Sequence, residues 1–192
     1  MKPDFQISFN KALSNEGLIS NNKSDHGGFT YRGISQTKHP TWPGWKIIDS
    51  HVETGYIPSL LNDAALQNLV IEFYRTEFWN KIQGDLLPSQ LITDELFESS
   101  INLGVPAASE ILQKTINLLN RNARLFPDIL VDGIIGTQTL AALNKSIAAN
   151  GEKLFFNLLN YYQAKRYIEI IEKDHTQEIF IGWFNRIDIV KT

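Results

Sequence analysis

The first apolar pattern along the chain has helical spacing and ends in a carboxylate. It predicts a helix over residues 4–16. Glu16 falls on the same face as the apolar positions, and Gly17 follows it as a residue suited to a helix C-terminus. Burial and the negative end of the helix dipole would both raise the pKa of this glutamate. The apolar positions of the face are Phe5, Phe9, Ala12 and Leu13.

The pattern changes over the next 45 residues. A short strand or hairpin is predicted at residues 29–34, and residues 36–62 are predicted to be irregular because prolines and glycines interrupt any long helix. Trp42 and Trp45 allow two interpretations. Their indoles could stack on sugar rings, or they could form the local core of the loop, which we favour. The interrupting residues are Pro40, Pro43, Gly44, Gly55 and Pro58.

Helical spacing returns over residues 62–83, where an amphipathic helix is predicted with Asp63 in its first turn and Gly84 and Pro88 after its end. Its apolar stripe consists of Leu66, Leu69, Val70, Phe73, Tyr74 and Phe78.

A further helix is predicted over residues 93–104, with Thr93 as its N-cap and Leu96, Phe97 and Ile101 facing inward. Glu98 and Asn102 lie one turn apart on one face. They could line a cleft, or they could be solvated residues of an ordinary capped helix, and the pattern does not separate the two interpretations.

The remaining chain is predicted to be helical, with a turn at Asp132-Gly133. A helix follows Pro106, with Ile111, Leu112, Ile116 and Leu119 as its stripe. After the turn, Ile134 and Ile135 are expected in the core, and another helix is expected from Thr137. Asp132 is interpreted as a turn residue, since a calcium loop would need more oxygen ligands at regular spacing.

Two more helices are predicted at the C-terminal end, over residues 151–173 and from Thr176. Arg186 could bind an acidic ligand or pair internally, and we favour the internal pair. The expected apolar positions are Leu154, Phe155, Leu158, Leu159, Tyr162, Ile168, Phe180, Trp183, Phe184 and Ile187.

Composition narrows the function classes. The 192 residues are 43% apolar and 20% charged, which is typical of a globular protein, and the net charge of −3 gives no support to nucleic-acid binding. The chain has no cysteine, and its histidines at 26, 39, 51 and 175 lack metal-ligand spacing, so no disulfide, thiolate metal site or zinc site is predicted. The N-terminus shows no secretory signal and no stretch could span a bilayer.

The polar stretch at residues 14–35 is the strongest candidate for chemistry. Glu16 and Asp25 flank a glycine-containing loop, and glycoside hydrolysis requires two carboxylates, one to protonate the leaving oxygen and one to assist water or stabilise charge. Taken singly, each has an ordinary interpretation: Glu16 as a solvated helix end and Asp25 as a turn residue before Gly-Gly.

This stretch resembles the signature of glycoside hydrolase family 108, the bacterial and phage N-acetylmuramidases. The family pattern is E-G-G-Y, a short polar run, then D-x-G-G-x-T-x-x-G-I-T. The chain departs from it at Leu18, where the family has glycine, and at Ser35, where the family has threonine. The corresponding residues here are Glu16-Gly17-Leu18-Ile19 and Asp25-His26-Gly27-Gly28-Phe29-Thr30-Tyr31-Arg32-Gly33-Ile34-Ser35.

Several expectations follow from the resemblance. It implies a mainly α, lysozyme-like fold with Glu16 as general acid, Asp25 as the second catalytic group and Thr30 as a holder of water. It also implies cleavage of the β-1,4 bond between N-acetylmuramic acid and N-acetylglucosamine, without a cofactor. Candidate substrate-binding residues are Gly28, Tyr31, Glu98 and Asn102.

The C-terminal half resembles a helical peptidoglycan-binding module, through VDGIIGTQTLAALN and the G-W-x-N-R pattern at residues 182–186. We therefore expect a lysozyme-like domain at 4–104 and a binding module at 105–190, packed against the first. The expected partner is the peptidoglycan glycan strand. A monomer without stable membrane insertion is expected, made in the bacterial cytoplasm and delivered to the wall by a holin or another export system.

Two other functions are compatible with parts of the chain. A peptidoglycan-binding or phage structural protein could keep the fold without catalysis, and Leu18 is the residue that favours this alternative. A wall peptidase ranks below both because the chain offers neither a Cys/His pair nor metal ligands.

Overall fold

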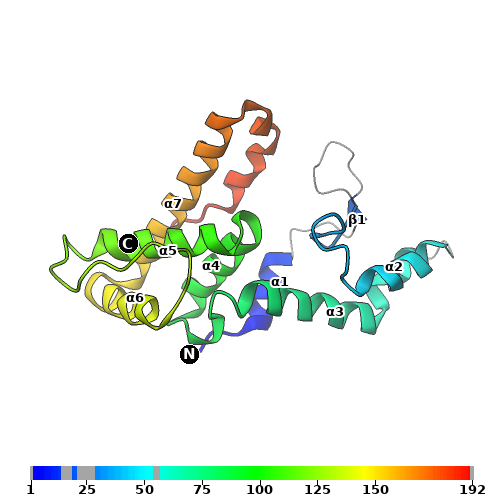
Figure 1. Ribbon diagram of the computed structural model, residues 1–192, viewed down its shortest axis with the longest axis horizontal. Coiled ribbons are helices and arrows are strands. Elements are labelled where there is room, and N and C mark those ends of the chain that lie inside the picture. The colour runs from blue at the N-terminus through cyan, green and yellow to red at the C-terminus, as the bar shows by residue number, and fades with distance from the viewer. Residues whose placement is uncertain (1, 14–18, 21–28, 54–56, 191–192) are drawn as a thin grey trace. The chain divides into compact units, whose positions relative to one another are not determined.

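The computed structural model describes residues 2–13, 19–20, 29–53 and 57–190, and its fold is mainly α, as the sequence predicts (Figure 1). The chain divides into two compact units. We call Met1–Ser8 with Phe78–Thr192 the helical unit and Phe9–Glu77 the hairpin unit. Helix α1, Phe5–Leu13, contributes to both. Its predicted end at Glu16 lies outside the described residues.

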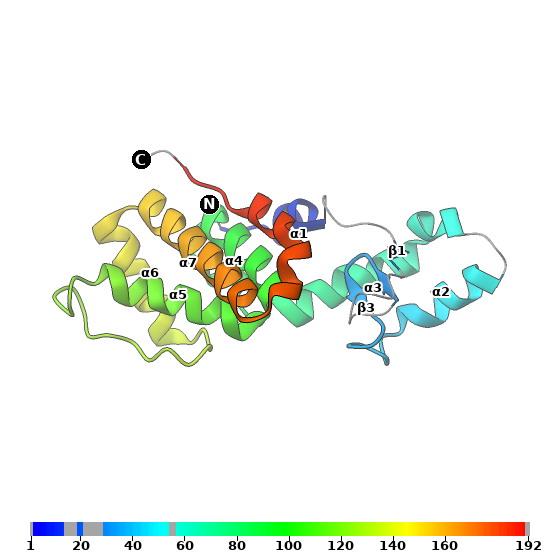
Figure 2. The ribbon, with the colours of Figure 1, turned by 90° about the horizontal axis from the view of Figure 1, so that it is seen from above.

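The helical unit is built on three helices that pack against one another, α4, α5 and α7. Helix α6 packs on α5 and α7, and the final 3-10 segment η4 folds back along α7 (Figure 2). The elements are η3 (Gly84–Leu86), α4 (Gln90–Leu103), α5 (Val105–Leu119), α6 (Thr137–Asn150), α7 (Glu152–Lys173) and η4 (His175–Arg186).

Apolar burial explains why these helices pack. The side chains that face inward are almost wholly inaccessible, and Trp79 adds edge-to-face contacts with Phe5 and Phe97 at 5.4 and 5.8 Å. Burying each such side chain stabilises the fold by roughly 1.5–3 kcal/mol. The buried set includes Ile92, Leu96, Leu112, Ile116, Leu143, Phe155, Phe156 and Leu159.

The hairpin unit contains a small antiparallel sheet in the order β1-β2-β3. The predicted hairpin is confirmed, with Thr30 paired to Ser35 and Tyr31 to Ile34. The unit's elements are β1 (Ile19–Ser20), β2 (Thr30–Tyr31), β3 (Ile34–Ser35), α2 (Gly44–Glu53), η1 (Ile57–Asn62) and α3 (Ala64–Tyr74), followed by a π-helical turn at Arg75–Trp79 that passes into the helical unit.

The prediction that residues 36–62 are irregular is wrong, because α2 occupies Gly44–Glu53. Pro43 directly precedes the helix, where a missing N–H costs nothing. Gly44 lies under the indole of Trp42, and a Cβ at this position would come within 2.2 Å of the Trp42 ring. The proline and glycine therefore begin a helix that the prediction expected them to prevent.

Helix α4 begins earlier than predicted. Ser89, not Thr93, is its N-cap, and its hydroxyl accepts a hydrogen bond from the Ile92 N–H at 3.4 Å. Thr93 is buried inside the first turn and donates its hydroxyl proton to the Ser89 carbonyl at 2.7 Å. The earlier start brings the fully buried Ile92 into the helix, which favours Ser89 over the later candidate.

Three predicted core positions are instead exposed: Ile134, Leu154 and Ile168. Ile134 directly follows the Asp132-Gly133 turn and points outward, whereas Ile135 is buried. The last predicted helix is a 3-10 segment with a break at Phe180, and its aromatic residues are only half-buried. Such a segment covers one side of α7 without forming a core of its own.

A loop at residues 120–136 joins α5 to α6 and is held by three amide side chains, those of Gln113 and Asn117 in α5 and that of Asn120, which caps the helix. Gln113 donates to the Asp132 carboxylate at 2.8 Å and to the Ile134 carbonyl at 3.0 Å, and accepts from the backbone N–H groups of Asp132 and Gly133. Asn117 bonds both backbone groups of Ile129. Asn120 bonds Asp128 and Ala123. We call the three amide residues Gln113, Asn117 and Asn120 the amide ladder.

Candidate active site

The structure describes four of the seven candidate site residues. Glu16, Asp25 and Gly28 lie outside the described residues. Thr30 and Tyr31 form strand β2 of the hairpin unit, and Glu98 and Asn102 lie on α4 of the helical unit. The described geometry therefore concerns the hairpin that carries Thr30 and the α4 face that carries Glu98.

Thr30 is positioned by the alternation of side chains along β2. It pairs with Ser20 of β1 and Ser35 of β3, and its neighbour Tyr31 is wholly buried. Because successive strand residues point to opposite faces, the Thr30 hydroxyl lies on the face away from that buried ring. Thr30 is half-buried, so this hydroxyl is on a partly accessible face of the sheet.

Tyr31 fixes the hairpin from the core side. Its hydroxyl donates to the Leu60 carbonyl at 3.3 Å and accepts from Gln67 Nε2 at 2.9 Å. Burial raises the pKa of this phenol, partly offset by the Gln67 hydrogen bond. Tyr31 is wholly buried among the described residues, and its predicted role in substrate binding stays a prediction.

The turn between β2 and β3 has two residues with positive φ, Arg32 at 46° and Gly33 at 80°. Two such residues make the type I′ turn that suits a tight hairpin, but positive φ is unfavourable for arginine. Contacts from α3 hold it in place. Arg32 donates to Gln67 Oε1 at 2.6 Å, and its carbonyl accepts from the Tyr74 hydroxyl at 2.7 Å.

Gln67 is the functional candidate that the sequence prediction missed. Its amide accepts from Arg32 and donates to both the Tyr31 hydroxyl and the Leu60 carbonyl, the latter at 2.8 Å. One side chain thus joins α3, the hairpin and η1. The available signal was a polar residue directly beside Leu66 on an amphipathic helix, which by itself is common.

The start of α3 is also fixed by side chains. The Asp63 carboxylate accepts from the Leu66 N–H at 2.9 Å and lies 3.2 Å from His51 Nε2. The hydrogen bond from the Leu66 N–H lowers the pKa of Asp63 below its ordinary value, and the hydrogen bond with His51 lowers it further. The carboxylate is therefore kept in its charged, capping form one turn before Gln67.

The two indoles of the hairpin unit form core, as favoured from the sequence. Trp42 and Trp45 are 8% and 5% exposed, their rings lie 5.0 Å apart, and Trp45 Nε1 donates to the His39 carbonyl at 2.7 Å. Tyr31 lies in offset contact with Trp42 at 6.4 Å. The aromatic cluster thus backs the hairpin.

On α4, Glu98 is half-buried and Asn102 is exposed. The Asn102 amide donates to the Glu98 carbonyl at 3.0 Å, and Arg186 Nε lies 3.7 Å from Glu98 Oε1. The prediction that Arg186 pairs with a residue of the protein itself is confirmed. Neither contact prevents the Glu98 side chain from also facing a ligand, so its cleft-lining role stays a prediction.

Behind this pair lies Tyr167, which is 1% exposed and accepts a hydrogen bond from Gln163 Nε2 at 3.0 Å. Burial raises the pKa of Tyr167 to about 12, with Arg186 acting in the opposite direction. The neutral phenol is therefore the form that suits this position.

The part of the chain that the structure describes offers neither a metal site nor a membrane span. No group of three or more histidine, cysteine or acidic side chains there could hold a metal ion. Likewise, none of the described helices has the length and apolar character that a bilayer span requires.

Two protein-family models match this chain, one in each half. The model of the family described as glycosyl hydrolase 108 matches residues 9–104, half of the chain. A model described as a predicted peptidoglycan domain matches residues 107–188. No curated protein matches. A solved structure titled as SagA of Brucella abortus has a similar fold, with a TM-score of 0.61 and 24% identity over 95% of this chain and 92% of that one.

Proposed function

Because the chain belongs to the glycosyl hydrolase 108 family, we propose that it is an N-acetylmuramidase that cleaves the β-1,4 bond between N-acetylmuramic acid and N-acetylglucosamine. Its place among glycoside hydrolases and its peptidoglycan domain make it a peptidoglycan hydrolase. The observation that carries the finer proposal is the order Glu16, Asp25 and Thr30, which falls within the matched residues.

In this proposal Glu16 protonates the oxygen of the leaving sugar, and Asp25 orients water or stabilises the positive charge that develops on the other sugar. Thr30 holds the water through its hydroxyl. The support from the structure concerns Thr30: the hairpin presents its side chain on the face opposite the buried Tyr31, and Gln67 and Tyr74 fix the turn.

Gly28, Tyr31, Glu98 and Asn102 are proposed to contact the glycan, and Tyr31 also supports the hairpin. Residues 4–104 are proposed as the hydrolase domain and residues 105–190 as the domain that holds the enzyme on the wall. We also propose action by a monomer outside the cytoplasm, reached through a holin or another export system.

The experiment compares wild type, Glu16→Gln and the control Glu72→Gln, which removes an exposed carboxylate from α3. Turbidity of purified peptidoglycan is followed, and the soluble products are analysed by mass for new reducing ends on N-acetylmuramic acid. We expect clearing by wild type and Glu72→Gln, and a loss of at least about a hundredfold for Glu16→Gln because general acid catalysis contributes about 10²–10⁴-fold.

A Glu16→Gln protein that stays folded and keeps most of its activity would refute the assignment of the general acid. Sedimentation with the wall without clearing by wild type would instead favour the non-catalytic binding protein. Leu18, at the family's glycine position, would then be the first residue to replace.

A further inference from the structure

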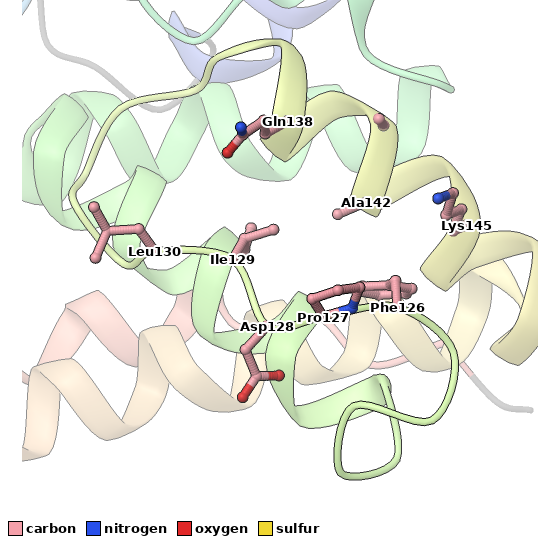
Figure 3. Close-up of a pocket in the computed structure, with 9 residues that line it drawn as sticks. Phe126, Pro127, Asp128, Ile129, Leu130, Gln138, Ala142 and Lys145 are labelled. Atoms are coloured by element: carbon pink, nitrogen blue, oxygen red, sulfur yellow. The ribbon is translucent and has the colours of Figure 1, made fainter.

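The amide ladder shapes one wall of a groove in the helical unit. The loop at residues 120–136 forms this wall, and α6 forms the other (Figure 3). The groove has a volume of about 360 Å³, within the range of ligand pockets. Because Gln113, Asn117 and Asn120 bond the loop backbone directly, the wall is held in shape before any ligand arrives.

The groove is mainly apolar. Phe126 and Ala142 are buried at its floor, and Leu130 is 75% exposed at its edge. A sugar carries a hydroxyl on most carbons, and each hydroxyl that leaves water without a new partner costs about 1–3 kcal/mol. The lining therefore suits small aliphatic groups better than sugar rings. Its apolar residues are Phe126, Pro127, Ile129, Leu130, Ala141 and Ala142.

The charged groups at the groove are not equivalent. The Asp128 carboxylate is bonded by the Asn120 amide, and in Figure 3 it points away from α6. Lys145 is exposed on α6, and over the described residues no ion pair engages its ammonium. The rim thus offers one uncommitted positive charge beside an apolar floor, which complements an anionic group on an apolar ligand.

We propose that this groove binds the peptide stem of peptidoglycan. The small aliphatic side chains of the stem lie against Ile129, Leu130 and Ala142, and a stem carboxylate pairs with the Lys145 ammonium. Gln138, at the start of α6, lines the same groove and supplies an amide to the peptide backbone. The inference rests on the proposed function in one respect only, namely that the wall is the substrate.

Two variants of the full chain test the groove, each with a different chemical basis. Lys145→Gln removes the charge, and Ala141→Trp fills the groove from an exposed helix position. Lys114→Gln is the matched control, because it neutralises an exposed lysine on α5 that is paired with Glu110 at 2.9 Å. The probes are soluble stem peptide released from purified peptidoglycan by an amidase, and glycan strands stripped of their stems.

Calorimetric titration should show that wild type and Lys114→Gln bind the stem peptide. Lys145→Gln should raise the dissociation constant about tenfold, the usual effect of losing a hydrogen bond to a charged group. Ala141→Trp should abolish binding, and 0.5 M salt should weaken wild-type binding by screening the charge pair. Circular dichroism checks that both variants fold.

The proposal is overturned if wild type does not bind the stem peptide, if only stripped glycan binds, or if both groove variants bind the peptide as wild type does. Hydrolysis is measured separately on the same proteins by reducing ends. Stem binding without hydrolysis would refute the muramidase and leave the groove assignment standing, whereas hydrolysis without stem binding would do the reverse.

Discussion

The hairpin of the hairpin unit and the loop of the helical unit are both held by amide side chains from a neighbouring helix or its cap, but the number of amides differs. Gln67 alone bonds the Arg32 side chain, the Tyr31 hydroxyl and the Leu60 carbonyl. The loop at 120–136 is bonded at three places by the amide ladder. A segment with one such anchor should be released by one substitution, whereas a segment with three should loosen in steps.

The difference corresponds to the proposed tasks of the two segments. A hairpin that presents a water-holding threonine must be placed within a fraction of an ångström, because small displacements of catalytic groups cost large factors in rate. A binding wall only has to keep its shape along a groove. Because Gln67 is the only amide among the described contacts that hold the hairpin, with the Tyr74 hydroxyl as its one helper from α3, we expect the hairpin to be the more sensitive of the two.

Among the substitutions that test this comparison, Gln67→Ala should have the largest effect on activity. It leaves the Arg32 guanidinium without its Gln67 acceptor and removes one donor from the buried Tyr31 hydroxyl, so the strained turn can relax. We expect a loss of at least about tenfold in kcat on peptidoglycan, with wall sedimentation unchanged. Asn68→Ala, at the next and exposed position of α3, is the control. Wild-type kcat in the Gln67 variant would show that the hairpin needs no such anchor.

Next in size is the effect of removing one member of the ladder. Gln113 is 1% exposed and makes four hydrogen bonds to the loop, so Gln113→Ala should lower the free energy of unfolding by about 2–4 kcal/mol through unsatisfied backbone groups. Urea unfolding measures this loss, and hydrolysis of soluble muropeptides should be unaffected. Asn144→Ala is the control, since within the described structure that amide bonds only Leu140 of its own helix.

The comparison would fail if Gln113→Ala abolished wall binding altogether, because the other two members of the ladder would then contribute nothing. Combining Gln113→Ala with Asn117→Ala sharpens the test. Both bond one loop, so a combined loss different from the sum of the single losses would measure their coupling.

A smaller loss of stability is expected at alkaline pH. Each unit contains a buried tyrosine whose hydroxyl is bonded by a glutamine, Tyr31 by Gln67 and Tyr167 by Gln163. The pKa of Tyr167 is raised to about 12 by burial, whereas the unfolded chain has the ordinary value of 10. Its contribution to stability is complete below pH 10 and is lost as the pH rises from 10 to 12, because only the unfolded state releases the proton there. Tyr167→Phe should flatten this decline, measured by urea unfolding at pH 9 and 11.

An equal decline in Tyr167→Phe and wild type would mean that another group controls alkaline unfolding. The buried Tyr31, whose pKa is also raised, is then the next candidate. Tyr31→Phe would show whether this tyrosine, and not Tyr167, causes the decline.

The smallest effect is expected where an ion pair, and not an amide, makes the contact. Arg186 and Glu98 lie 3.7 Å apart and are 25% and 20% exposed, so Arg186→Gln should lower stability by less than about 1 kcal/mol. Glu98→Gln should match it if Glu98 only pairs. A raised KM for peptidoglycan in Glu98→Gln, without one in Arg186→Gln, would instead identify Glu98 as a cleft residue.

Much of the helical architecture could be predicted because apolar spacing reports burial directly. The stripe of α5 is buried at all four predicted positions, Ile111, Leu112, Ile116 and Leu119. Prediction failed where the same local residues are compatible with either a loop or the start of a helix. Pro43 and Gly44 punctuate loops, yet here they begin α2, because the Trp42 ring occupies the space above Gly44. No local pattern contains that contact.

The candidate site was predictable to a different degree. Glu16, Asp25 and Thr30 remain predictions, because they rest on the two carboxylates that glycoside hydrolysis needs and on the resemblance to the family pattern. Gln67 was missed because its partners, Arg32 and Tyr31, lie more than thirty positions earlier in the chain. A polar residue on a partly buried helix face predicts that a partner exists, but the fold decides which one.

The amide ladder has a consequence for how the protein responds to its surroundings. Carboxamide groups carry no net charge, so added electrolyte does not screen their hydrogen bonds to the loop backbone at Ala123, Ile129 and Gly133. The Lys145 ammonium differs, since its field is screened over about 8 Å at physiological ionic strength. If the proposed binding mode holds, a change of ionic strength would alter how long the groove keeps its ligand without reshaping the groove, so that ligand release and unfolding would depend on different variables.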